Sequence, residues 1–170
     1  RTKHRSATFR YPPEMRGDLE NFATEVSLMT KLHHPNIVMI MGVAIDARAL
    51  CLRIVTELMD VGSLFRVMQA QEYSVKSPML LKLCLDAVKG MSFLHHRDPV
   101  IVHRDVKSPN ILVSRDWIGK VSDFGLSTTS KNAKKGWQSK AEAECDASPL
   151  WASPEALRCE HQTAAADVFS

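Results

Sequence analysis

The stretch His103-Arg104-Asp105-Val106-Lys107-Ser108-Pro109-Asn110 brings an acid, a cation and an amide together within eight residues. Two short apolar pieces follow it, residues 111–113 and 120–122, and the polar turn between them predicts a small β-hairpin. Asp123-Phe124-Gly125 begins after Ser122, and Ser153-Pro154-Glu155 stands farther along the chain. These three strings carry most of the chemistry that the sequence offers.

In this order and at this spacing, the three strings resemble the catalytic core of protein kinases. Phosphoryl transfer needs a carboxylate at the attacking hydroxyl, a cation at the transferred phosphate and oxygen ligands for magnesium. The resemblance assigns the first two roles to Asp105 and Lys107, and it makes Asn110 and Asp123 the metal ligands, with Asn110 also counted as catalytic. It therefore implies ATP and Mg²⁺ as cofactors and a protein with Ser or Thr acceptors as the substrate.

A second triplet, His96-Arg97-Asp98, provides an internal control for this resemblance. Val100 stands where the lysine of the pattern belongs, and His103 stands where the asparagine belongs. Only the later triplet completes the pattern, so we interpret residues 96–98 as a helix end and turn.

The resemblance extends over almost the whole chain. Glu25 resembles the glutamate of helix C that pairs with the ATP-anchoring lysine, and residues 32–38 resemble the loop that follows that helix. Residues 55–59 resemble the end of a strand and the hinge, with Thr56 as gatekeeper. The residues that the resemblance assigns to nucleotide binding are Glu25, Thr56, Glu57, Met59, Ser63, Leu112 and Asp123. Of these, Glu57 and Met59 would bind adenine through their backbone groups, and Leu112 would form the floor of the adenine pocket.

Further positions match the family in structural roles. The residues that resemble the hydrophobic spine of an active kinase are Met29, Ile40, His103 and Phe124, for which ordinary core packing is an equally good interpretation. Asp167 resembles the aspartate that opens helix F and braces the catalytic loop.

Lys107 is the form found in serine/threonine kinases, and the strings HRDVKSPNIL and HPNIV are most similar to the tyrosine-kinase-like group, which includes Raf-like and mixed-lineage-like kinases. Ser148 replaces the usual threonine, and we expect its hydroxyl to bond Asp105 and Lys107. Arg104 suggests activation by an upstream kinase that phosphorylates the following loop. The candidate acceptors are Thr128, Thr129, Ser130 and Ser139.

The expected fold class is α+β, a bilobal protein-kinase-like fold that is incomplete. We expect residues 1–170 to form a partial kinase domain: a basic loop over 1–17, the N-lobe from about helix C over 18–58, and the hinge and C-lobe up to the start of helix F over 59–170. The periodicity predicts helices near 18–32, 64–68 and 77–95, two antiparallel strands over 37–45 and 49–58, and a long loop over 127–148. The helix ending at His95 is apolar on nearly every face and is expected to be buried.

Two parts of the kinase pattern are missing. No glycine-rich loop or V-A-x-K strand precedes residue 18, so the ATP-anchoring lysine is either Lys3 or a residue upstream of Arg1. We therefore expect the 170-residue chain by itself to be inactive, although its parent is an enzyme. The alternative is a pseudokinase that serves as a binding or scaffold module. Metal binding by the histidine pairs 33–34 and 95–96 ranks below both.

The composition is typical of a globular protein in which positive and negative charges nearly balance. There are 22 Lys and Arg against 19 Asp and Glu, for a net charge of +3, which predicts no nucleic-acid or membrane partner. No apolar run reaches the roughly 18 residues of a membrane helix. The four cysteines are widely spaced, so we expect reduced thiols and a cytoplasmic location.

Overall fold

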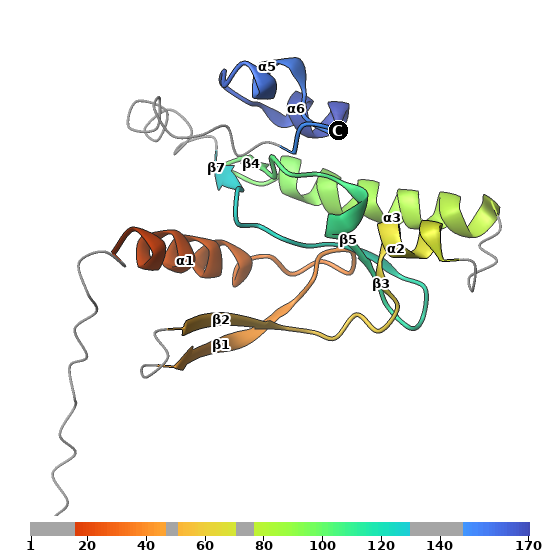
Figure 1. The fold of residues 1–170 in the computed structure, drawn as a ribbon, viewed down its shortest axis with the longest axis horizontal. Coiled ribbons are helices and arrows are strands. Elements are labelled where there is room, and N and C mark those ends of the chain that lie inside the picture. Colours follow the sequence, from red (N-terminus) through yellow and green to blue (C-terminus); the bar gives the residue numbers. More distant parts are fainter. Residues whose placement is uncertain (1–15, 47–50, 71–76, 130–147) are drawn as a thin grey trace, which may run out of the picture.

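The computed structural model describes residues 16–46, 51–70, 77–129 and 148–170. Lys3, Ser130 and Ser139 lie outside these residues, as does most of the loop predicted over 127–148. In Figure 1 the first helix lies beside a pair of strands, and the longest helix runs across the other half of the molecule. The elements of the first half are α1 (Arg16–Met29), β1 (Ile40–Asp46) and β2 (Cys51–Thr56).

Strands β1 and β2 form the predicted antiparallel pair, with Val43 opposite Ile54. Side chains alternate along β1: Ile40 packs against the core, whereas Met41 is 67% exposed. Helix α1 begins at Arg16 instead of residue 18 and ends at Met29. The expected order of helix and two strands is therefore correct.

The second half of the chain is built around a long helix and a small sheet. Its elements are β3 (Gly62–Ser63), α2 (Leu64–Gln69), α3 (Ser77–His95), β4 (Ile101–Val102), η2 (Ser108–Asn110), β5 (Ile111–Val113), β6 (Gly119–Val121), β7 (Thr128–Thr129), α5 (Pro154–Leu157) and α6 (Ala164–Phe169). Strands β5 and β6 form the predicted hairpin, and β3 adds a third strand beside β5. Helix α3 ends at His95, so residues 96–98 lie in a turn, as predicted.

One face of α3 packs into the core. Leu83 and Leu94 are fully buried, and Gly90 lies so close to the loop after α1 that an added Cβ would stand 2.5 Å from the Asn36 carbonyl oxygen. The expectation that α3 is buried on nearly every face is wrong for the described residues. Leu81 and Val88 are each 62% exposed, because the described elements cover only one side of the helix.

A single apolar cluster joins the two halves of the molecule. It includes Met29 of α1, Leu83 of α3, Val121 of β6 and Phe124, with Ile40 of β1 packed against it. Ile37 also forms a parallel β-bridge with Val121, so the loop after α1 is hydrogen-bonded directly to β6. The α+β class and the kinase-like arrangement are as predicted.

Cys84 and Cys159 differ in oxidation state. Cys84 is a free, exposed thiol, but Cys159 is disulfide-bonded, so the expectation of reduced cysteines is wrong there. Spacing along a chain does not reveal which thiols meet after folding. Across the described ranges, we find no helix with the length and apolar character needed to span a bilayer.

Candidate active site

Asp105 lies at the centre of a hydrogen-bonded cluster. Its carboxylate accepts from Lys107 Nζ at 2.7 Å, from Ser148 Oγ at 2.8 Å and from Asn110 Nδ2 at 2.8 Å. Lys107 Nζ also donates to Ser148 Oγ at 2.8 Å, as expected from the sequence. Three groups from two distant segments thus hold one carboxylate in a fixed orientation.

The same contacts determine the charge of Asp105. Burial by itself raises the pKa of this carboxyl, but hydrogen bonds from Lys107, Ser148 and Asn110, together with the Lys107 charge, outweigh it. The pKa of Asp105 therefore lies below its ordinary value of 3.8. At neutral pH the group is a carboxylate that can accept a proton.

The segment before Asp105 is braced from α6. Asp167 accepts from the backbone N–H of His103 at 2.8 Å and from that of Arg104 at 2.7 Å, and it also meets His95 Nε2 at 2.8 Å. Arg104 has a φ of 71°, a conformation that costs energy for a residue with a Cβ. The buried carboxylate holds the backbone in this conformation, which is the bracing role expected of Asp167.

His103 is fully buried and links Asp105 to the segment that precedes Asp123. Its Nδ1 accepts from the Asp105 N–H at 3.3 Å, and Nε2 lies 3.0 Å from the Ser122 carbonyl oxygen. A carbonyl only accepts, so the proton is on Nε2. Burial lowers the pKa of His103 more than the nearby carboxylates raise it. Its ring contacts Phe124 with centroids 5.1 Å apart, as expected for the spine.

Asn110 precedes β5 and Asp123 follows β6, so both lie at the open end of the β5–β6 hairpin, opposite its turn. The carbonyl oxygen of Asn110 accepts from Ser122 N at 2.9 Å and from Ser122 Oγ at 2.8 Å, which ties the ends together. The side-chain amide nitrogen of Asn110 donates to both the backbone carbonyl and the carboxylate of Asp105, and within the described residues its side-chain oxygen forms no hydrogen bond. The exposed Asp123 carboxylate accepts from Gly125 N only at 3.5 Å. Two oxygen donors of this kind suit Mg²⁺.

Glu25 of α1 lies near Asp123. Both carboxylates approach Gly125, where an added Cβ would stand 3.5 Å from Asp123 Oδ1 and 3.9 Å from Glu25 Oε2. Burial and then the negative charge of Asp123 raise the pKa of Glu25. No Lys or Arg in the described part of the chain forms an ion pair with Glu25.

The residues expected to meet adenine lie along one continuous path. Thr56 ends β2, and Glu57 follows it; Met59 is buried, and its carbonyl accepts from Gly62 N at 3.1 Å. Ser63 caps α2 by accepting from Arg66 N at 3.3 Å, and it stands opposite Leu112 in the sheet. The structure thus brings the end of β2, the following segment and the β3–β5 pair together.

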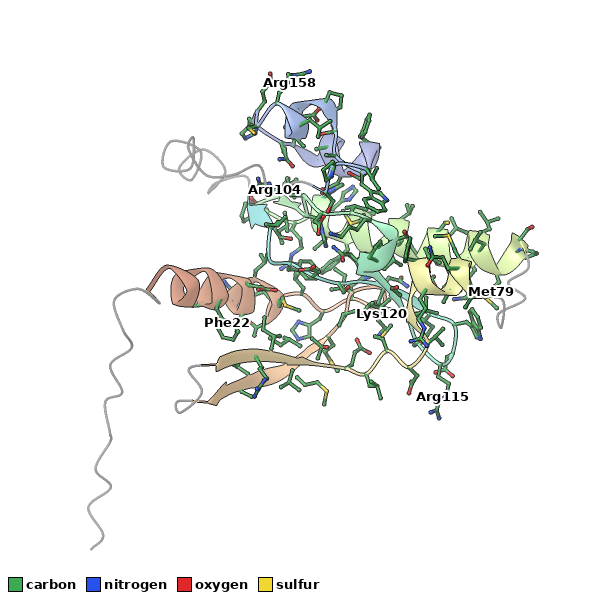
Figure 2. The ribbon with its side chains drawn as sticks, viewed as in Figure 1. Phe22, Met79, Arg104, Arg115, Lys120 and Arg158 are labelled. Carbon is green, nitrogen blue, oxygen red and sulfur yellow. The ribbon has the colours of Figure 1, made fainter. Side chains whose placement is uncertain are left out.

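Lys120 was not identified from the sequence. It links the segment that follows β2 to strand β6. Its Nζ lies 2.8 and 2.7 Å from the two carboxylate oxygens of Glu57, and Lys120 itself is paired with Leu112 in the hairpin. In Figure 2 Lys120 lies on the side of β1 and β2, whereas Arg104 lies on the side of α5 and α6. Glu57 Oε1 also accepts from Met39 N at 2.7 Å, so this side chain is fully engaged.

Arg104 was expected to meet a phosphate on the following loop. Its guanidinium donates only weakly, to the Leu126 carbonyl at 3.5 Å, and the residue borders a small pocket with Gln162 and Ser170. Of the candidate acceptors, Thr128 and Thr129 belong to β7 and pair with β4.

The histidine pairs do not form a metal site in the described residues, where no cluster of three or more metal-ligating side chains occurs. His34 stacks on Phe93 with centroids 4.9 Å apart, and His95 pairs with Asp167. His96 contacts the Ser92 carbonyl at 2.8 Å. The histidine-pair alternative is therefore not supported.

Comparison with known proteins gives one consistent family. Residues 11–170 match the family model described as protein tyrosine and serine/threonine kinase. The probable serine/threonine-protein kinase drkA of Dictyostelium discoideum is 40% identical over 152 residues, covering 89% of this chain and 22% of that protein. The probable serine/threonine-protein kinase SIS8 of Arabidopsis thaliana is 42% identical over 152 residues, covering 89% and 14%.

The serine/threonine-protein kinase CTR1 of Arabidopsis thaliana is 41% identical over 155 residues, covering 89% of this chain and 18% of CTR1. The chain thus spans about 14–22% of the length of these relatives. Their names agree with the serine/threonine type that Lys107 indicates.

Proposed function

The chain belongs to the family of protein tyrosine and serine/threonine kinases, and we propose on that premise that the protein is an ATP-dependent serine/threonine kinase. It transfers the γ-phosphate of ATP to Ser and Thr hydroxyls of protein substrates, in cytoplasmic signalling. The observation that carries the proposal is the cluster around Asp105, whose carboxylate is oriented by Lys107, Ser148 and Asn110.

In this mechanism Asp105 orients the acceptor hydroxyl and takes its proton. The hydroxyl oxygen forms a bond to the γ-phosphorus, the bond from that phosphorus to the β–γ bridging oxygen breaks, and ADP leaves. Lys107 lies 2.7 Å from Asp105 and offsets the negative charge of the transferred phosphoryl group. Asp105 has a lowered pKa, so it is ionised and ready to accept the proton at neutral pH.

Asn110 and Asp123 are the proposed magnesium ligands, since both offer oxygen atoms at adjacent ends of one hairpin. Magnesium, when bound, neutralises charge on the ATP phosphates. The hairpin and the Asn110–Ser122 contacts hold the two ligands in a fixed relation.

For the nucleotide, the proposed contacts are the backbone of Glu57 and Met59 at the adenine edge and Leu112 below it, with Thr56 and Ser63 bordering the pocket. Their support is the continuous path that runs from the end of β2 to the β3–β5 pair. Glu25 is proposed to pair with the ATP-anchoring lysine. A partly buried carboxylate whose pKa is raised by burial and by Asp123 gains stability from a cation of this kind.

We further propose that residues 18–58 belong to the N-lobe and residues 59–170 to the hinge and C-lobe. Arg104 is proposed to receive a phosphate added to the following loop by an upstream kinase. The support is its location beside β4 and β7 and the long hydrogen bond, 3.5 Å, that its guanidinium donates to the Leu126 carbonyl among the described residues.

The test is to incubate the full-length protein with Mg²⁺ and ATP labelled on the γ-phosphate, together with a generic protein substrate, and to identify the labelled amino acids. We expect phosphoserine and phosphothreonine. Label on tyrosine alone would contradict the serine/threonine assignment. Binding of ATP without any transfer would instead favour the pseudokinase alternative, a binding or scaffold module.

A further inference from the structure

Two buried polar side chains outside the active site converge on Gly119, the first residue of β6. Gly119 N donates to Asp86 Oδ2 at 3.0 Å, and Asn36 Nδ2 donates to the Gly119 carbonyl at 3.0 Å. Asp86 belongs to α3 and is 6% exposed, whereas Asn36 follows α1 and is 5% exposed. Both backbone polar groups of one residue are therefore satisfied by side chains from two separate elements.

The contact between α3 and β6 depends on glycine at this position. A Cβ on Gly119 would stand 3.2 Å from Asp86 Cβ and 3.2 Å from the Leu83 carbonyl oxygen. These distances are tighter than ordinary contacts, so only glycine allows the helix and strand to approach this closely without a shift. The hydrogen bond from Gly119 to Asp86 is made possible by that approach.

Lys82 completes the arrangement one helical turn before Asp86. Its Nζ lies 2.8 Å from Asp86 Oδ2 and 2.7 Å from the Trp117 carbonyl oxygen. We call Lys82 and Asp86 the α3 clamp, because together they hold the backbone at Trp117 and Gly119 where the β5–β6 turn enters β6. Helix α3 thus fixes the turn end of the hairpin.

The hairpin carries both proposed magnesium ligands at its other end. Asn110 directly precedes β5, and Asp123 follows β6 after Ser122. Gly119 pairs with Val113, so the α3 clamp acts on the same two strands that lead to these ligands. Strand β6 is only three residues long, so Gly119 lies close along the chain to the segment before Asp123.

Asp86 remains charged despite its burial. Desolvation raises the pKa of this carboxyl, but the hydrogen bond from Lys82, the Gly119 N–H and the charges of Lys82 and Lys89 outweigh desolvation and lower it. An apolar side chain would leave the Gly119 N–H without its acceptor, and a buried unpaired donor is costly. Among the described residues the Asp86 carboxylate bonds Lys82 and Gly119 and forms no hydrogen bond with Asp105 or Asp123, so any effect on them would have to pass through β6.

We propose that Asp86 is a positioning residue for magnesium binding: through Gly119 it holds the β5–β6 hairpin, at whose open end Asn110 and Asp123 would hold one divalent cation. The inference rests on the proposed function, because it takes these two residues as the metal ligands. It adds a residue of α3 to the set on which the reaction depends.

The experiment measures two binding reactions of the full-length protein. The first is ATP binding by calorimetry over a series of Mg²⁺ concentrations, and the second is adenosine binding in EDTA, which needs no metal. For Asp86→Ala we expect the Mg²⁺ concentration for half-maximal ATP binding to rise about tenfold, the scale seen when supports of metal ligands are removed. Adenosine affinity is expected to change less than the Mg²⁺ requirement does, because the Asp86 carboxylate bonds Lys82 and Gly119 and reaches the hinge only indirectly, through the Lys120–Glu57 pair.

Two matched variants separate positioning from a general loss of structure. Asp86→Asn keeps an acceptor for Gly119 N, and we expect it to restore the Mg²⁺ requirement to within about threefold of the wild type. Lys89→Ala changes a charge on the same helix, where Nζ lies 3.9 Å from Asp86, without removing a contact to β6, and is expected to behave as the wild type. If Asp86→Ala does not fold, Asn36→Ala removes the other support of Gly119 and is expected to raise the Mg²⁺ requirement in the same way.

The inference is overturned if Asp86→Ala weakens adenosine and Mg-ATP binding equally, or if it changes neither. It is also overturned if Asp86→Asn is as impaired as Asp86→Ala. A wild-type protein that binds neither ATP nor adenosine overturns the proposed function as well. The two failures are thus distinguished by the wild-type titration.

Discussion

Lys120 and Glu57 form an ion pair in which one ammonium group meets both oxygens of the carboxylate, at 2.8 and 2.7 Å. Lys120 belongs to β6, and Glu57 follows β2, so the pair joins the segment proposed to hold adenine to the strand that leads to Asp123. Their side chains are only 16% and 22% exposed. Water screens such a pair less than it screens a pair on the open surface.

We predict that this ion pair couples the two segments energetically. Lys120→Met and Glu57→Gln, singly and together, are compared by denaturant unfolding of the full-length protein. Because the groups touch, the double variant is expected to lose less stability than the sum of the singles, with a coupling energy on the order of 1 kcal/mol. The exposed pair Arg115 and Asp60, 3.6 Å apart, supplies the control cycle, for which we expect a coupling near zero. Additive effects for Lys120 and Glu57 would show that the contact does not contribute.

Ser148 is predicted to set the acid limit of activity through its hydrogen bond to Asp105. That bond stabilises the charged carboxylate and is one of the causes of the lowered pKa. Ser148→Ala removes the donor, so the pKa of Asp105 rises and the acid limb of the pH–rate profile moves to higher pH. The measurement is the initial rate of phosphate transfer from about pH 3 to about pH 8, a range that begins below the ordinary aspartate pKa of 3.8 and ends above neutrality.

Ser148→Thr is the matched control, because threonine keeps the hydroxyl. Its acid limb is expected to coincide with that of the wild type. The lowered pKa of Asp105 also makes folding stability depend on pH. The charged carboxylate contributes to stability above its ordinary pKa of 3.8, and this contribution is lost as the pH falls through the lower pKa of the folded state. An acid limb that Ser148→Ala leaves in place would contradict the assignment of Asp105 as the proton acceptor.

Asp167→Asn is predicted to destabilise the segment that carries Asp105. The carboxylate accepts from the N–H groups of both His103 and Arg104, whereas an amide offers one oxygen and would turn its own donors toward the other N–H. One buried donor is left unsatisfied, at a cost of about 1–3 kcal/mol by denaturant unfolding. Asp60→Asn, at an exposed aspartate, is expected to change stability by less than about 0.5 kcal/mol. Equal effects of the two substitutions would argue against the bracing role.

Much of the fold could be predicted because periodicity and turn residues act locally. The β5–β6 hairpin, the antiparallel pair before residue 58 and the helix ending at His95 all follow from patterns within a few residues. The exposed face of α3 could not be predicted, because apolar residues such as Leu81 and Val88 are expected in the core unless the neighbouring elements are known. The β4–β7 pair was missed because two-residue strands carry no periodicity.

The proximity of Asp105, Lys107 and Asn110 could be predicted because they stand within one short string, and the structure joins them by direct contacts. Lys120 and Asp86 were missed for the opposite reason. Lys120 meets Glu57 across 63 residues, and Asp86 meets Gly119 across 33. An aspartate or lysine on an amphipathic element is read as a solvated residue unless its partner is known.

The most direct test of the central claim is phosphate transfer by the full-length protein carrying Asp105→Asn, compared with the wild type and with Asp116→Asn, which changes an exposed aspartate in the β5–β6 turn. Loss of the proton acceptor is predicted to lower the rate of transfer by about 10²–10⁴-fold while ATP binding stays within about twofold, because Asp105 acts on the hydroxyl and not on the nucleotide. Asp116→Asn is expected to match the wild type. Transfer at the wild-type rate by Asp105→Asn would contradict the account.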